Sequence, residues 1–386
     1  MTIIPRAKGW TGTLHYWASA LLLLALVPCM RRLNLPLNLK WAGFLFIQWL
    51  ALAILSIFVA ALLYLVGIAR RETIGPVVRR FRRDKRRILL VLAYFLFLYW
   101  AAGWLKALVL TVDTVAIIEL LDELKSSGMR RVATAILVPG LYMFLGLLLV
   151  SAYNDIIVSV RFFAATDVAF NSADKWLLHG WSVPRLAQWA MHILPLSFFR
   201  FLEFAYFGMF LQVGSALILT SLDSGERGGL QFVGAILTAY YVSLAVFFIW
   251  PSHGPYYLCP THFSDFPRQL ASYAAQKKYL HDAQALWAHV RLSQISFDYF
   301  IAFPCMHITQ PLIGLWFLRR WKRAVAVLVV YDLVLVVAIV LLEWHYVVDI
   351  IAGILLAILA IATVDDHELW RSIARNTTAE CPVIAS

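Results

Sequence analysis

Two ionisable side chains, His345 and Asp349, stand four residues apart in the stretch EWHYVVD, between two long apolar runs. On a helix, residues at i and i+4 share a face, so the spacing predicts that the carboxylate bonds one imidazole nitrogen. Such a bond fixes the imidazole tautomer and leaves the second nitrogen free to attack an electrophile or to bind a metal. Ionisable residues at membrane depth are costly and usually functional, so the pair predicts a reactive site.

A second histidine, His307, lies in FIAFPCMHITQPL (300–312) at the entry to an apolar run. A short basic turn, RRWKR (319–323), leads into the next apolar run, which extends to His345. Antiparallel helices joined by a short turn would place both histidines at one face of the membrane, together with the loop after the run 230–250. There His307 could act as acid and base across a substrate.

The segment over 250–298 is rich in cations and histidines, which suits an anionic substrate such as a phosphate ester. The candidate substrate-binding residues are Ser252, His253, Arg268, Lys277, Lys278, Arg291 and Cys305. The four cysteines form no CxxC pair, so their spacing predicts no zinc site. Cys259 and Cys305 flank the loop, and they either pair in an oxidising compartment or remain unlinked thiols.

The elements that must position these residues are membrane helices. The chain of 386 residues is 62% hydrophobic and 14% charged, with a mean hydropathy of +0.77, whereas soluble domains are about 45–50% apolar and about 25% charged. A membrane span needs about 20 apolar residues. The clearest candidates are 41–69, 88–112, 132–153, 200–222, 230–250, 301–318, 324–342 and 347–364. A shorter run at 15–30 is a span, an interfacial helix or a retained signal anchor.

The positive charge is concentrated rather than spread. The net charge is +11, and residues 70–87 carry nine basic side chains against two acidic ones. Between apolar spans such a run predicts a cytoplasmic loop facing anionic headgroups, so nucleic acid is not the expected partner. Residues 113–131 alternate as an interfacial amphipathic helix would, and 154–199 suit a re-entrant or surface-lying stretch. We expect a scaffold at 1–131, a catalytic membrane core at 132–365 and a tail at 366–386.

The motifs F-P-C-M-H (303–307) and H-Y-V-V-D (345–349), the latter followed by I-I-A-G, resemble the type 2 phosphatidic acid phosphatase superfamily. The closest likeness is to the inositol phosphorylceramide synthase (aureobasidin-resistance) branch. That branch has a P-S-x-H box, a later H-Y-x-V-D-x-x-A-G box, and a proline- and aromatic-rich segment before the first box. Here W-P-S-H-G-P-Y-Y (250–257) stands in that place, and N-S-A-D-K-W-L-L-H-G (171–180) resembles a segment that often precedes the core.

The resemblance implies an all-α, polytopic bundle with a six-helix phosphatase-like catalytic core, working without metal or cofactor. His345 would attack phosphorus, Asp349 would orient it, and His307 would protonate the leaving group and later deprotonate the acceptor. The substrate would be a membrane phospholipid or a polyprenyl phosphate. Water as acceptor makes a phosphatase, and a lipid alcohol makes a phosphotransferase, with phosphoinositol as one possible headgroup.

Three departures from the family pattern affect the phosphate contacts. Cys305 replaces the serine of the P-S-x-H box, which removes a hydroxyl donor. The family's S-R pair falls on Ala338 and Ile339, and there is no K-x6-R-P sequence. The synthase branch also lacks that arginine, so the absence favours this branch over a plain phosphatase. Replacement cations would come from the 250–298 segment, with His253 a better candidate for a phosphate contact.

Two other function classes are open from the sequence. A transporter or scramblase could use the His–Asp pair to relay protons or bind an ion, and a metalloenzyme could use His307, His345 and Asp349 as ligands. The RRWKR turn predicts an extracytoplasmic site, whereas counting spans from the basic loop 70–87 gives the opposite face. We expect the extracytoplasmic face, where the resembled enzymes mostly work.

Overall fold

A computed structural model describes residues 14–33, 52–64, 129–161, 164–258, 269–288 and 301–364, with isolated positions between 93 and 111. Every element of this described part is helical, and five helices are long and apolar enough to cross a membrane. The predicted all-α membrane architecture is therefore confirmed. The basic loop 70–87, the tail 366–386, most of 41–69 and 88–112, and most of the predicted interfacial helix 113–131 lie outside the described residues.

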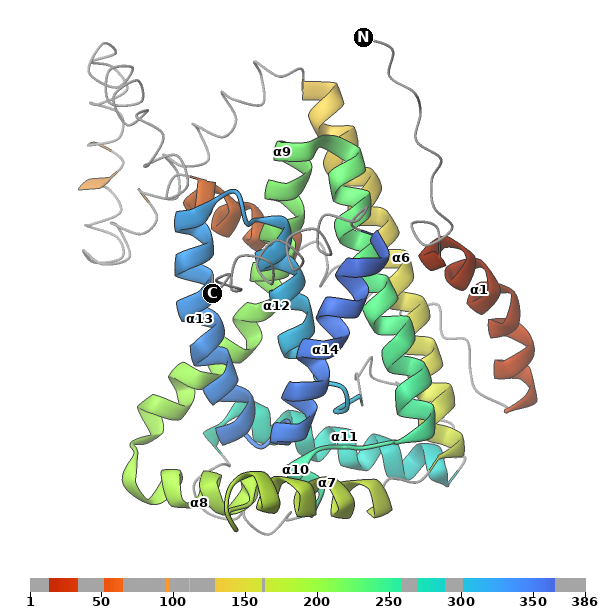
Figure 1. The fold of residues 1–386 in the computed structure, drawn as a ribbon, viewed down its shortest axis with the longest axis vertical. Coiled ribbons are helices and arrows are strands. Elements are labelled where there is room, and N and C mark those ends of the chain that lie inside the picture. Colours follow the sequence, from red (N-terminus) through yellow and green to blue (C-terminus); the bar gives the residue numbers. More distant parts are fainter. Residues whose placement is uncertain are drawn as a thin grey trace, which may run out of the picture.

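The longest helix, α9 (Leu196–Ile249), is two membrane-crossing arms joined at one residue. Its 54 residues would extend about 80 Å if straight, far more than a hydrocarbon core of about 30 Å. Gly225 interrupts it with φ 68°, a left-handed backbone value that glycine adopts without steric cost. Figure 1 shows the chain rising along one arm and returning along the other. The predicted runs 200–222 and 230–250 are these two arms.

Four further helices pack with the arms of α9 into a six-segment bundle. They are α6 (Met129–Val160), α12 (Met306–Phe317), α13 (Lys322–Leu341) and α14 (Val347–Val364). Each of the four contacts α9, and α12 also contacts α13 and α14. α12 spans only 12 residues, about 18 Å, and its sides are largely buried. The shortest helix of the bundle therefore lies in its interior, and α1 (Leu14–Arg32) packs outside against α6 and α9.

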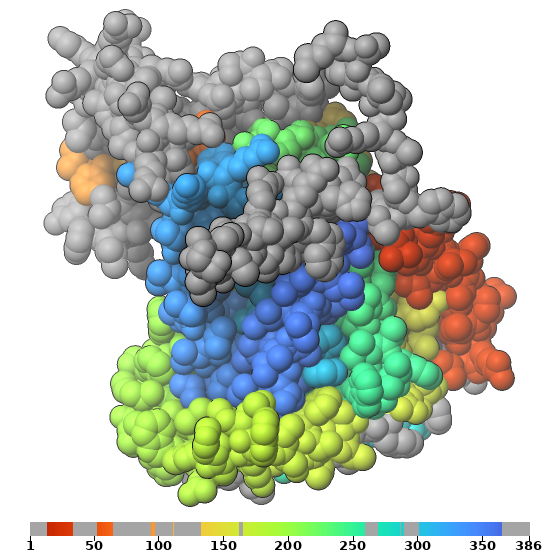
Figure 2. Space-filling model, in the orientation of Figure 1, coloured from red at the N-terminus to blue at the C-terminus, as the bar shows by residue number. Residues whose placement is uncertain are grey.

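One end of the bundle is covered by helices that lie across it, which we call the cap. The cap consists of α7 (Ala164–Leu177), α8 (Val183–Ile193), α10 (Pro255–Leu258) and α11 (Ala271–Trp287). These helices run along the lower edge in Figure 1, and α7 and α8 form a continuous band in Figure 2. The surface-lying interpretation of 154–199 holds for α7 and α8 but is wrong for residues 154–160, which complete α6.

The outer faces of α13 and α14 are apolar and exposed, as a lipid-facing surface requires. Large side chains there include Val330, Leu333, Leu355 and Leu359, each at least half exposed. Both helices lie at the front of Figure 2, directly above the cap. The apolar exterior and the buried α12 together identify the bundle interior as the place for polar chemistry.

The close approach of α12 and α14 gives a first testable prediction. A Cβ added at Gly353 would lie 2.5 Å from the Cys305 carbonyl oxygen, so Gly353→Ala must push the two helices apart. Overpacking of this kind costs about 1–3 kcal/mol, so we expect a lower thermal unfolding midpoint in detergent. Gly140→Ala on α6 is the matched control, because its added Cβ meets no atom within 4 Å. Equal midpoints for the two variants would contradict this packing.

Candidate active site

The turn between α13 and α14 holds His345 outside either helix. α13 ends in a Schellman-type arrangement, in which Trp344 N and Glu343 N donate to Ile339 O and Val340 O at 3.0 Å each. Glu343 takes the left-handed position with φ 58°, where glycine is usual. Because α13 stops here and α14 begins at Val347, the helical i and i+4 spacing considered for His345 and Asp349 does not apply to them.

Asp349 nevertheless reaches the same turn, because it lies in the first turn of α14. Its Oδ2 accepts a hydrogen bond from Tyr346 N at 2.8 Å, the half of a capping box in which the third helical residue reaches back. The same oxygen lies 3.4 Å from His345 Nδ1. Asp349 also positions the start of α12, because its backbone carbonyl accepts a hydrogen bond from Cys305 N at 3.0 Å.

The tautomer of His345 follows from its partners. His345 Nδ1 lies 2.8 Å from Ala302 O, and a carbonyl only accepts, so Nδ1 carries the proton. His345 Nε2 then presents its lone pair, and it lies 2.9 Å from His307 Nδ1. His307 Nδ1 is therefore the donor of that bond. The two histidines that the sequence placed at one membrane face are in direct contact.

His307 is held by aromatic stacking as well as by this bond. It is the second residue of α12, and its ring lies over Tyr206 of α9 with centroids 4.5 Å apart and planes inclined by 25°. Tyr206 in turn stacks on Trp344 at 5.0 Å and 6°. The aromatic stack ties the orientation of His307 to the turn that carries His345.

A pocket opens beside the two histidines. The lining is mainly aromatic and aliphatic, and besides His307 and His345 its polar and aromatic members are Tyr206, Phe207, Phe210, Tyr240, His253, Tyr256, Tyr279, Gln310 and Trp344. Within the described part of the chain, neither lysine nor arginine lines this pocket.

The predicted substrate-binding residues are thus divided. His253 lines the pocket, and burial lowers its pKa to about 3, so it is neutral at pH 7. Lys277 and Lys278 lie on α11 away from the pocket lining, where Lys278 Nζ pairs with Asp282 at 3.0 Å. Arg268 and Arg291 lie outside the described residues, as does Cys259.

Ser252 and Cys305 take structural positions next to the site. The Ser252 hydroxyl donates its proton to Asp167 Oδ1 at 2.7 Å. That proton therefore does not serve as a hydrogen-bond donor to a phosphate. Cys305 is the N-cap residue of α12. Its side chain is a fully buried free thiol.

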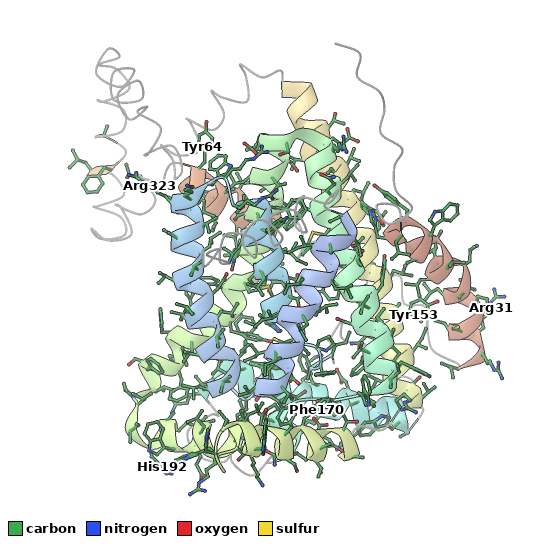
Figure 3. All side chains as sticks on the ribbon, in the orientation of Figure 1. Arg31, Tyr64, Tyr153, Phe170, His192 and Arg323 are labelled. Carbon is green, nitrogen blue, oxygen red and sulfur yellow. The ribbon has the colours of Figure 1, made fainter. Side chains whose placement is uncertain are left out.

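Two aspartates of α7 that the sequence analysis did not select hold the site loops in place. Asp167 accepts from Ser252 Oγ and from the backbone N–H groups of residues 253 and 254, at 2.7–3.2 Å. Asp174 accepts from Val347 N at 2.9 Å and Val348 N at 3.1 Å, which caps α14. Between them, Phe170 lies beneath α14 in Figure 3 and packs edge-on against Tyr346. The seven-residue spacing of the two carboxylates on an amphipathic helix was the available signal.

Burial raises the pKa of Asp167 to about 7, despite its hydrogen bonds, which gives a pH prediction. Because this folded-state pKa exceeds the ordinary value of 3.8, the protonated Asp167 contributes its full stabilisation of the fold below about pH 4. This stabilisation is lost as the pH rises to about 7. We expect the difference in unfolding midpoint between wild type and Asp167→Asn to shrink over that interval. Three pKa units correspond to at most about 4 kcal/mol.

His253 changes the stability of the fold with pH in the opposite direction to Asp167. This contribution is the same in wild type and variant, so it cancels in the difference between them. The lowered pKa of His253 makes stability fall as the pH drops from 6.5 towards 3 in both proteins. A wild-type minus variant difference that stays constant from pH 4 to 8 would show that Asp167 does not titrate in this range.

The sequence model of the PAP2 superfamily matches residues 169–363. This range runs from α7 to α14 and contains His307, His345 and Asp349. The chain belongs to the PAP2 superfamily. No curated protein and no solved structure matches it. PAP2 superfamily members are phosphatases and phosphotransferases, so the chain is an integral membrane enzyme of the lipid phosphatase or phosphotransferase type. The match is to the superfamily as a whole, so the inositol phosphorylceramide synthase branch stays a prediction.

Proposed function

We propose that this protein transfers a phosphoryl or phospho-headgroup from a membrane lipid through a covalent phosphohistidine at His345 Nε2. The observation that carries the proposal is the arrangement around His345. Its Nδ1–H is bonded to Ala302 O and lies beside Asp349, while its Nε2 accepts a hydrogen bond from His307 Nδ1 at 2.9 Å, and both histidines line the pocket. A nucleophile oriented from behind, with a proton donor beside it, is the arrangement that nucleophilic catalysis needs.

The first chemical step forms one bond and breaks another. His345 Nε2 attacks phosphorus, and the bond from phosphorus to the leaving oxygen breaks while His307, protonated on both ring nitrogens once the anionic substrate is bound, gives its Nδ1 proton to that oxygen and becomes a neutral imidazole. The phosphorylated imidazole retains its Nδ1 proton, and the nearby Asp349 carboxylate offsets the positive charge that develops on the ring. No metal takes part in this proposed route.

The second step reverses these roles. His307 Nδ1, now without its proton, accepts one from water or from an alcohol, and that oxygen attacks phosphorus as the bond to His345 Nε2 breaks. The start of α12 adds stabilisation, since the first N–H groups of a helix lack intrahelical partners and favour negative charge. Met306 and His307, the first two residues of α12, both line the pocket.

The cation-free described lining supports a phosphodiester donor rather than a phosphomonoester. A phosphodiester carries one negative charge, whereas a phosphomonoester carries up to two at neutral pH. One imidazolium, that of His307, and a helix N-terminus compensate a single charge more readily than two, because an unpaired buried charge is strongly penalised. The pocket lining therefore favours a phosphotransferase acting on a headgroup-bearing phospholipid, such as a phosphoinositol lipid, with a lipid alcohol as acceptor.

The charge distribution supports an extracytoplasmic active site. In the described residues, the end of the bundle opposite the cap carries a net charge of +3, from Arg227, Arg319, Arg320, Lys322 and Arg323 against Asp223 and Glu226. The cap helices carry a net charge of +1, from Lys175, Arg185, Lys277 and Lys278 against Asp167, Asp174 and Asp282. Figure 3 shows Arg323 at that end and His192 of the cap at the other. Cytoplasmic loops carry the excess of lysine and arginine, so the cap and the histidines would face the other side.

The proposed function is tested with purified protein in detergent, incubated without metal with phosphodiester phospholipids, phosphatidic acid and polyprenyl phosphates. Each lipid is tested with and without a lipid alcohol. We expect a headgroup-bearing product that requires both the phosphodiester and the alcohol. Release of inorganic phosphate from the monoesters alone would replace the transferase assignment with a phosphatase. Absence of turnover across the whole panel would contradict the proposal.

A further inference from the structure

Three side chains with metal-binding atoms converge at the start of α12. The Cys305 Sγ, a His307 ring nitrogen and a His345 ring nitrogen all lie within 4.8 Å of one another. The three residues come from two separate elements, the beginning of α12 and the α13–α14 turn. The spacing of the four cysteines gave no sign of a site at Cys305, because its two histidine partners are brought to it by the fold.

The hydrogen bonds around this cluster hold the His345 ring in the way that metal-binding histidines are usually held. Metal-ligating histidines usually donate their second ring N–H to a carbonyl or carboxylate, and His345 Nδ1 does so to Ala302 O with Asp349 beside it. The thiol is fully buried, and both histidines line the pocket. Three protein ligands would therefore be fixed, with the fourth position open to the pocket.

The geometry points to a site for Zn²⁺ or a similarly thiophilic divalent cation, formed by Cys305, His307 and His345, whose occupancy inhibits the enzyme. One thiolate and two imidazoles form a ligand set that suits zinc. The ion would coordinate His345 Nε2, the lone pair that attacks phosphorus in the function proposed above, and the inhibitory part of the inference rests on that function. The family's serine in place of Cys305 would supply no thiolate.

Binding requires the ligand atoms, which lie within 4.8 Å of one another, to close around the ion, and it releases one proton. Zinc–nitrogen bonds of about 2.0–2.1 Å at a tetrahedral angle separate the two nitrogens by roughly 3.4 Å, so the 2.9 Å contact between the imidazoles must open slightly. The thiol proton leaves to solvent, and the His307 proton moves from Nδ1 to Nε2. Because the thiol must deprotonate, we expect the apparent affinity to fall as the pH falls.

Binding is tested independently of turnover with Co²⁺, a spectroscopic substitute for Zn²⁺. The chelator-stripped protein in detergent is titrated with Co²⁺ alone, and thiolate-to-cobalt charge-transfer absorption is recorded. We expect saturation at one equivalent, loss of the band on adding Zn²⁺, and no band in Cys305→Ser. Cys29→Ser, the matched change at the other described free cysteine, keeps the band. A band that persists in Cys305→Ser, or no band in the wild type, would overturn the site.

Inhibition is then measured as a ratio within each protein. Loss of an outer-shell partner alone commonly weakens metal binding by 10–100-fold, so we expect Cys305→Ser to need about 100-fold more Zn²⁺ for half-inhibition of its own metal-free rate. Equal sensitivity of the two proteins would overturn the inhibitory role, and activation by Zn²⁺ would do the same. If the protein shows no turnover at all, the cobalt titration still decides whether the metal site exists.

Discussion

His345→Ala is expected to abolish both turnover and covalent labelling by a phosphorus-labelled lipid. The substitution removes the only atom that the proposed chemistry bonds to phosphorus, the Nε2 that faces His307. Loss of a nucleophile in a comparable covalent mechanism lowers kcat by about 10⁶-fold, so we expect a decrease of at least about 10⁴-fold. The measurement is single-turnover labelling followed by a quench, with the label lost in acid and retained in base, as a phosphohistidine requires.

The matched control for this prediction is His192→Ala. His192 is an exposed histidine on α8 in the cap, so its removal tests the loss of an imidazole away from the site. We expect its labelling and turnover to equal those of the wild type. Undiminished labelling of His345→Ala would assign the phosphoryl bond to another residue.

His307→Ala is expected to lower kcat by about 10²–10⁴-fold, the usual contribution of a positioned general acid. The loss should depend on the leaving group, because His307 Nδ1–H supplies a proton only when the departing oxygen needs one. A substrate with a p-nitrophenolate leaving group should therefore lose much less rate in the labelling step than a lipid alkoxide does. The labelled enzyme should also persist longer, since the acceptor is no longer deprotonated.

The leaving-group comparison separates catalysis from positioning. If His307 only held His345 in place, both substrates would lose the same factor. His307→Gln keeps a side chain of similar size that can hydrogen-bond to His345 but cannot relay a proton at neutral pH, so it should reproduce the leaving-group dependence. Equal losses for the two substrates in both variants would contradict the role of general acid.

The sequence predicted the parts of this fold that depend on apolar run length. The runs 200–222, 230–250, 324–342 and 347–364 all correspond to helical segments of the bundle, because only a helix satisfies its own backbone in lipid. The short RRWKR turn also correctly brought His307 and His345 to the same end. Two antiparallel helices joined by a short turn must place the start of the first and the end of the second on the same side of the bundle.

The details of the site depended on contacts that a sequence does not display. Ala302 offers only a backbone carbonyl, so nothing in its side chain marks it as the nearer partner of His345 Nδ1. His345 lies outside α13 because Glu343, just after the end of that helix, has a left-handed conformation. Glycine usually marks such a position in a sequence, and here it is absent. The lysines of α11 were selected for charge alone, and the orientation of that helix keeps them away from the pocket lining.

The two carboxylates of α7 make one helix responsible for the order of two distant parts of the chain. Asp167 binds the loop at 252–254, and Asp174 binds the first turn of α14. Lifting α7 would break these bonds together, so the five donors they satisfy belong to one cooperative unit of local unfolding. α7, a surface helix without a catalytic side chain of its own, thereby holds the two parts of the active site in place. A ligand that loosened α7 would inactivate the site without contacting it.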